Sequence, residues 1–190
     1  MKKRVFIIHG WGASPKSEWF PWLKKELEKN NFDAFVLEMP NTEEPKIDEW
    51  VSFLSNQVGE PDENTYFVGH SIGCQVIMRY LEKFDGVRIS GIIFVASWFN
   101  LVNLDSEEEE EIAKPWLETP INLDKVKNNS KKIVAIFSDN DPFVELKNKD
   151  VFEKELNAEI IIEHNKGHFS DDDKTTELPI VLEKILEMSK

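Results

Sequence analysis

Short apolar runs recur along the chain and predict buried β-strands. Most of these runs are rich in Val, Ile and Phe, and several are continuous rather than alternating with polar residues. Continuous runs of this length are typical of strands that are covered on both faces, as in a parallel sheet. The pattern predicts six strands: Val5–Ile8, Ala34–Leu37, Tyr66–Val68, Gly91–Val95, Ile133–Phe137 and Glu159–Ile162.

The segments between these runs carry apolar residues at helical spacing. The sets are Trp19, Leu23 and Leu27; Ile47, Val51 and Leu54; Val76, Ile77, Tyr80 and Leu81; Phe152 and Leu156; and Ile180, Leu182 and Ile185. Strands that alternate with helices imply right-handed crossovers. We therefore expect an α/β fold with a doubly wound, mainly parallel six-stranded sheet and helices on both faces.

One interval, residues 96–131, interrupts the alternation. It carries the acidic run Glu107–Glu111 and two prolines, Pro115 and Pro120. We interpret it as an irregular insertion with short helices, and we expect one domain over residues 1–190. Because like charges in series mostly keep a surface solvated, the run predicts an exposed helix face.

The charge balance restricts the expected partners and location. Lys and Arg total 23 against 36 Asp and Glu, which gives a net charge of −13 at pH 7. This excess repels phosphate backbones and anionic lipid headgroups, so we expect neither nucleic acid nor a membrane surface as a partner. No apolar stretch approaches the roughly 20 residues of a spanning helix, and Val5–Ile8 is too short for a signal peptide. We expect a soluble, cytoplasmic protein.

The cysteine and histidine content argues against a metal site. A single cysteine, Cys74, excludes an intramolecular disulfide and a cysteine-based zinc cluster. The four histidines are scattered and do not make a ligand set. The one pair with H-x-x-x-H spacing, His164 and His168, follows a predicted strand and has a glycine between its members, so it does not lie on a helix. We therefore expect neither a metal nor a cofactor.

A nucleophile-elbow pattern follows the third predicted strand. Gly69-His70-Ser71-Ile72-Gly73 matches G-x-S-x-G and precedes the helix that includes Val76. A serine on such a turn sits in a strained backbone conformation, and the flanking glycines let the chain pass closely. The turn lifts the Ser71 hydroxyl above the sheet edge and places the amide of Ile72 where an oxyanion develops. Ser71 is the candidate nucleophile; the alternative is a glycine-rich turn with an N-capping serine.

An acidic segment, Ser138-Asp139-Asn140-Asp141-Pro142, follows the fifth predicted strand. A catalytic triad needs an orienting carboxylate after a strand beyond the elbow. Asp141 precedes Pro142, which favours an extended backbone and lets the side chain project from the loop. Asp139 is better placed to cap the turn. The pattern alone leaves both aspartates as candidates.

Two histidines follow the sixth predicted strand. His168 has a glycine neighbour that gives the loop freedom to bring an imidazole toward Ser71, whereas His164 lies closer to the strand without one. We interpret His168 as the candidate base. Ligands bind at the carboxyl ends of strands in an open parallel sheet. The order Ser71, Asp141, His168, each after its own strand, is that of an α/β-hydrolase triad.

The loop after the first predicted strand, His9-Gly10-Trp11-Gly12, offers a second oxyanion donor. Glycines on both sides of Trp11 let the backbone approach a bound carbonyl. The amides of Trp11 and Ile72 are therefore the expected oxyanion donors. We interpret His9 as a support for this loop and His70 as the variable position of the elbow.

Four strings, FVGHSIG, SDNDPF, KGHF and IIHGW, resemble the family of small serine hydrolases that includes YdeN and retinoblastoma-binding protein nine. They extend from about residue 5 to residue 170, and Pro115-Trp116 also resembles a feature of the family. The resemblance implies a minimal α/β-hydrolase fold without a large cap domain. It implies Ser71 as nucleophile, Asp141 as acid and His168 as base. It favours Asp141 because the aspartate before the Pro-Phe pair is the matching position.

These observations predict a serine hydrolase that cleaves small neutral acyl esters through an acyl-enzyme on Ser71. Its partner is then a small-molecule acyl substrate. The negative net charge disfavours anionic substrates. In the insertion, Trp98, Phe99 and Trp116 are expected to form a tight apolar wall of the substrate pocket, which suits short acyl groups.

Two alternatives use some of the same residues. A non-catalytic protein-binding module on a hydrolase fold would present aromatic side chains as an interaction surface, namely Trp19, Trp22, Trp98, Phe99 and Trp116. Such a module has no physical need for a triad at three strand ends. A nucleotide-binding oxidoreductase would use Gly10-Trp11-Gly12 and Glu38, but Pro15 stands where the third glycine is required.

Overall fold

The structure, a computed structural model that describes residues 2–190, is built on one six-stranded sheet. All five strand pairings are parallel, in the order β2-β1-β3-β4-β5-β6. This arrangement confirms the predicted doubly wound α/β fold. The strands are β1 (Arg4–Ile8), β2 (Asp33–Leu37), β3 (Thr65–His70), β4 (Gly91–Val95), β5 (Ile133–Ser138) and β6 (Glu159–Glu163).

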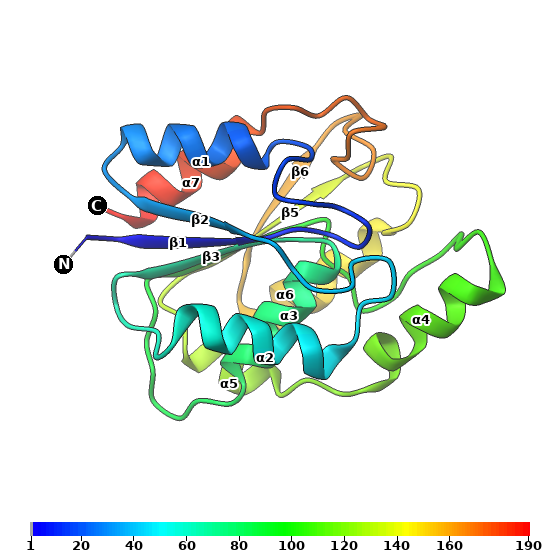
Figure 1. Cartoon of the computed structure of the whole chain (residues 1–190), viewed down its shortest axis with the longest axis horizontal. Helices are drawn as coiled ribbons and strands as arrows, with labels where there is room; N and C mark the ends of the chain where they lie inside the picture. Colours follow the sequence, from blue (N-terminus) through cyan, green and yellow to red (C-terminus); the bar gives the residue numbers. More distant parts are fainter. Residues whose placement is uncertain (1) are drawn as a thin grey trace.

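Helices cover both faces of the sheet (Figure 1). One face carries α1 (Phe20–Lys29) and α7 (Pro179–Met188). The other carries α2 (Ile47–Val58), α3 (Ile72–Leu81), α5 (Leu123–Asn128) and α6 (Lys149–Leu156), and a short 3-10 helix, η1 (Leu146–Asn148), precedes α6. None of the helices within residues 2–190 is long and apolar enough to cross a membrane.

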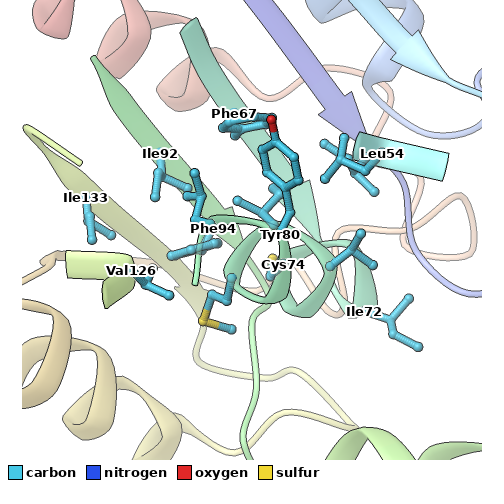
Figure 2. Close-up of a cluster of buried hydrophobic side chains, with 14 of the residues drawn as sticks. Leu54, Phe67, Ile72, Cys74, Tyr80, Ile92, Phe94, Val126 and Ile133 are labelled. Atoms are coloured by element: carbon cyan, nitrogen blue, oxygen red, sulfur yellow. The ribbon is translucent and has the colours of Figure 1, made fainter. Parts of the chain in front are cut away.

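Each strand contributes side chains to two hydrophobic layers, because successive side chains point to opposite faces of the sheet. In β1, Val5 and Ile7 join the layer beneath α1 and α7, whereas Phe6 and Ile8 join the layer beneath α2 and α3. Figure 2 shows part of the second layer, where Tyr80 of α3 lies near Phe67 of β3. Burying a large apolar side chain contributes about 1.5–3 kcal/mol, so these layers dominate the stability of the fold.

The junction between β3 and α3 is tighter than the sequence predicts. The strand continues past Val68 to His70, and the helix begins at Ile72 rather than near Val76. Gly69 and His70 remain in the ladder beside β4. The apolar pattern does not show this extension because glycine and histidine carry no strand signal. Ser71 is therefore the single residue between strand and helix.

The insertion is more regular than expected, because its first helix, α4 (Glu107–Glu118), has twelve residues. The hydroxyl of Ser106 accepts a hydrogen bond from the N–H of Glu109 (3.2 Å), and the Glu109 carboxylate accepts one from the N–H of Asp105 (2.7 Å). This resembles a capping box. Glutamates in the first turn also complement the positive end of the helix dipole. Most of the acidic run is exposed, and Figure 1 shows α4 at the carboxyl end of the sheet.

Candidate active site

Ser71 occupies a strained turn at the carboxyl end of β3. Its backbone lies at φ 51° and ψ −121°, and its N–H donates to the oxygen of Val95 (2.9 Å). A non-glycine residue in such a region costs of the order of 1–3 kcal/mol and persists only where its surroundings enforce it. Here they do: a Cβ at Gly69 would lie 2.8 Å from the nitrogen of Cys74, and one at Gly73 would overlap the oxygen of Ile8. The two glycines are therefore required for the elbow.

His168 and Asp141 form a close pair between the loops after β6 and β5. The Nδ1 atom of His168 lies 2.8 Å from Oδ2 of Asp141. The Asp141 side chain is 1% exposed and that of His168 is 15% exposed. The other oxygen of Asp141 accepts hydrogen bonds from the N–H groups of Phe143 (2.9 Å) and Val144 (3.0 Å). The carboxylate is thus fixed by its own loop and can hold the imidazole in one tautomer.

Asp139 and His164, the rival candidates, pair with each other instead. Nδ1 of His164 lies 2.5 Å from Oδ2 of Asp139, and the His164 side chain is 78% exposed. The N–H of Asn165 and the contact with His164 lower the pKa of Asp139. Neither residue lines the cavity that contains Ser71. The structure therefore brings together Asp141 and His168, not Asp139 or His164, beside the candidate nucleophile.

Ser71 and His168 line the same cavity, whose volume is about 350 Å³. The hydroxyl oxygen of Ser71 accepts a hydrogen bond from Nε1 of Trp98 (3.3 Å). Within residues 2–190, Ser71 and His168 form no hydrogen bond with each other. Hydrogen bonds between a nucleophile and its base often become short only when substrate binds. Ser71 and His168 are therefore grouped by the cavity that both line and not by a hydrogen bond between them.

The wall of this cavity has an apolar part and an acidic part. The apolar side chains are Trp11, Leu101, Leu104 and Phe143, and the acidic ones are Glu18, Glu43 and Glu109. The ring of Phe143 meets that of His168 edge to face, with centroids 5.4 Å apart. Acidic groups at the mouth give it a negative potential.

The prediction that Phe99 and Trp116 line the substrate cavity is wrong. The ring of Phe99 packs on Phe152 with centroids 5.0 Å apart, and the indole of Trp116 donates to the oxygen of Pro45 (3.0 Å). Both side chains are therefore directed into helix packing. Trp98 does contact Ser71, but it is buried and does not line the open cavity.

Of the two residues expected to supply oxyanion donors, Ile72 follows Ser71 directly and Trp11 lines the same cavity as Ser71. Ile72 is the first residue of α3, so its N–H belongs to the turn that has no acceptor within the helix. Trp11 lines the cavity, and its indole donates to the oxygen of Glu43 (2.9 Å). A Cβ at Gly10 would lie 3.5 Å from Cβ of Ser71, so the loop after β1 passes directly over the nucleophile.

His9 supports the first loop. Its Nδ1 lies 2.8 Å from the oxygen of Gly10, and its Nε2 accepts a hydrogen bond from the N–H of Met39 (3.2 Å). Burial lowers the pKa of His9, which keeps the ring neutral with its proton on Nδ1. The ring therefore connects the loops after β1 and β2.

His70 has a role that the sequence pattern does not reveal. It is buried between Glu18 and the main chain of His168, with Nε2 2.8 Å from the oxygen of His168. The elbow pattern treats this position as variable, and no local signal identifies its partners.

Across the described part of the chain, residues 2–190, no group of three or more His, Cys, Asp or Glu side chains is arranged to hold a metal ion.

Comparisons with known proteins identify the family of the chain. Residues 5–187 match the family described as serine hydrolase. The chain is 34% identical over 183 residues to the putative hydrolase YdeN of Bacillus subtilis, covering 95% of this chain and 93% of that protein. It is 27% identical to the serine hydrolase RBBP9 of Rattus norvegicus, over 86% of this chain and 84% of that protein.

Solved structures give the same fold. The crystal structure of the ydeN gene product from B. subtilis matches with a TM-score of 0.90 at 32% identity and covers both chains completely. Est1E from Butyrivibrio proteoclasticus matches with a TM-score of 0.75 at 16% identity, over 98% of this chain and 88% of that one. The fold is the minimal α/β-hydrolase fold. The chain belongs to the serine hydrolase family.

Proposed function

We propose that this hydrolase cleaves small neutral acyl esters through a covalent acyl-enzyme on Ser71. One observation carries the proposal: the strained Ser71 lines the same cavity of about 350 Å³ as His168, whose Nδ1 pairs with the buried Asp141. A nucleophile, an oriented base and an acid on three different loops are the requirements of acyl transfer by a triad.

The proposed mechanism assigns one task to each group. His168 donates Nδ1–H to Asp141, so its Nε2 lone pair is free to accept the proton of Ser71 as the hydroxyl attacks the ester carbonyl. The amides of Ile72 and Trp11 stabilise the oxyanion. His168 then protonates the departing alcohol, and a water molecule activated by the same ring releases the acid and restores Ser71.

The cavity supports a small, uncharged acyl group. Its apolar side chains, including Leu101 and Phe143, favour a hydrocarbon acyl chain, and its volume limits the length of that chain. Glu43 and Glu109 would repel a carboxylate or phosphate on the substrate.

The direct test compares Ser71→Ala with the parent on p-nitrophenyl acetate and with a fluorophosphonate probe. We expect turnover to fall by about 10³-fold or more and labelling to disappear, with an unchanged thermal midpoint. Ser52→Ala, on the exposed face of α2, is the matched control and should keep both activities. A Ser71→Ala protein as active as its parent would overturn the proposal.

The alternative of a protein-binding module loses three of its five proposed anchors, and Trp22 and Phe99 are only partly exposed. Trp19, Trp98 and Trp116 are each at most 1% exposed, so they are not available as interface anchors. Fluorophosphonate labelling of the parent separates the two ideas, because a module without catalysis has no activated serine to label.

A further inference from the structure

His70 lies directly behind the candidate base and contacts two acceptor groups. Its side chain is 2% exposed and its Nε2 is 2.8 Å from the main-chain oxygen of His168. Its Nδ1 is 3.0 Å from Oε2 of Glu18, whose side chain is 7% exposed. The rings of His70 and His168 have centroids 5.1 Å apart. His70 therefore joins a buried carboxylate to the loop that carries the base.

The surroundings of His70 favour the doubly protonated ring. Burial alone lowers the pKa of His70, but the charge of Glu18, the contact with its carboxylate and the carbonyl of His168 together raise it above its ordinary value. The charge of Asp141 acts in the same direction, and the rings of His9 and His168 are the other titratable groups near His70. The contact with Glu18 is a close ion pair rather than an aligned hydrogen bond.

The main chain of His168 is held at both of its polar atoms. Its N–H donates to Oδ2 of Asp173 (2.8 Å), and its oxygen accepts from Nε2 of His70. The neighbouring residues Gly167 and Phe169 both have positive φ angles, 54° and 58°. Surrounding contacts hold a loop in these conformations, and His70 supplies the contact at the main-chain oxygen of His168.

Glu18 is itself anchored to the same region. Its N–H donates to Oδ1 of Asp171 (2.7 Å), and its backbone has a φ of 56°. Its main chain therefore contacts the loop after His168, and its side chain faces His70. The loop after β1, the elbow and the loop of His168 meet at this pair.

We propose that the Glu18–His70 ion pair positions the catalytic histidine: the His70 imidazolium holds the main-chain oxygen of His168, and Glu18 supplies the opposite charge. The inference rests on the proposed function, because it assumes that His168 is the general base. His70 acts through His168 and is a positioning residue. Its loss should therefore lower kcat much more than it changes KM.

The first experiment measures kcat and KM on p-nitrophenyl acetate for His70→Ala and His70→Gln. We expect His70→Ala to lower kcat by about 10- to 100-fold with KM within about twofold, because small displacements of a catalytic group are this costly. His70→Gln should recover most of kcat, since its side-chain amide can donate to the same oxygen. His164→Gln is the matched control, because His164 is exposed and outside the cavity.

The second experiment does not depend on activity. The four histidines are few enough for an NMR titration of each ring in the parent and in Glu18→Gln. We expect the pKa of His70 to lie above its ordinary value in the parent and to be lower in Glu18→Gln, because the charge of Glu18 raises it. A His70 that titrates at or below its ordinary value in the parent, or a His70→Ala protein with parental kcat, overturns the inference. Loss of the proposed function would instead appear as turnover that does not depend on Ser71.

Discussion

Gly73, at the start of α3, lies against the main-chain oxygen of Ile8 at the end of β1, with no room for a Cβ between them. This contact joins the elbow to the central strand and draws α3 in behind Ser71. The glycine is therefore needed for packing as much as for the turn, since its own φ is not in the left-handed region.

Gly73→Ala should destabilise the protein by about 1–3 kcal/mol, because backbone atoms cannot move aside as a flexible side chain can. Urea unfolding measures the loss. The matched control is Gly86→Ala, in an exposed turn with open space around the Cβ and a φ of 82°. That change costs only the conformational strain, about 1 kcal/mol. Equal losses in the two variants would show that the Ile8 contact is unimportant.

Asp141→Asn should reduce kcat by about 10²- to 10⁴-fold, whereas Asp139→Asn should leave it nearly unchanged. An asparagine in place of Asp141 no longer holds the Nδ1–H tautomer of His168, but Asp139 contacts only the exposed His164 and its loop. Steady-state kinetics on one ester measures both. The reverse ranking would transfer the role of the acid to Asp139.

Much of the site could be predicted from the sequence because its chemistry is local to strand ends. The positions of Ser71, Asp141 and His168 follow from three short motifs, each after an apolar run. Parallel strands bring their carboxyl ends to one edge, so the motifs meet once the sheet forms. The choice of Asp141 over Asp139 came from the family resemblance, because the matching aspartate precedes the Pro-Phe pair.

The cavity wall and His70 could not be predicted, because both depend on how distant loops meet. The ring of Phe99 packs on Phe152 of α6 rather than facing the cavity, and nothing near residue 99 signals that choice. Glu18 precedes α1 and reaches His70 only through the path of the first loop. Such contacts join residues far apart in the chain and leave no periodic pattern.

His9 should make the protein less stable at acid pH. Burial lowers the pKa of its ring, so below the unfolded value of about 6.5 the unfolded chain binds a proton that the folded chain resists. Stability is therefore complete above that value and falls as pH decreases through it. His9→Gln, which can accept from the N–H of Met39, should show a smaller loss of unfolding free energy between pH 7.5 and 5.5. The same loss in both proteins would contradict this account.

The acidic side of the cavity should select against anionic acyl groups at low ionic strength. Glu43 and Glu109 border the same space as Ser71, and the chain carries a net charge of −13. A potential of this sign lowers the local concentration of anionic substrate, and salt screens it over about 10 Å at 0.1 M. Acetate and butyrate esters should therefore be cleaved faster than a succinate half-ester, with the gap narrowing as salt is added.

Glu43→Gln tests that effect with one charge. Glu43 is exposed at the mouth, and only its main-chain oxygen holds Trp11, so the substitution should leave the loop in place. We expect kcat/KM for the succinate half-ester to rise a few-fold, roughly two- to fivefold, at low salt, and that for acetate to stay constant. Glu153→Gln, on the exposed side of α6, removes the same charge away from the cavity and should change kcat/KM for neither ester. An equal gain for both esters in Glu43→Gln would contradict a charge-selective role for this residue.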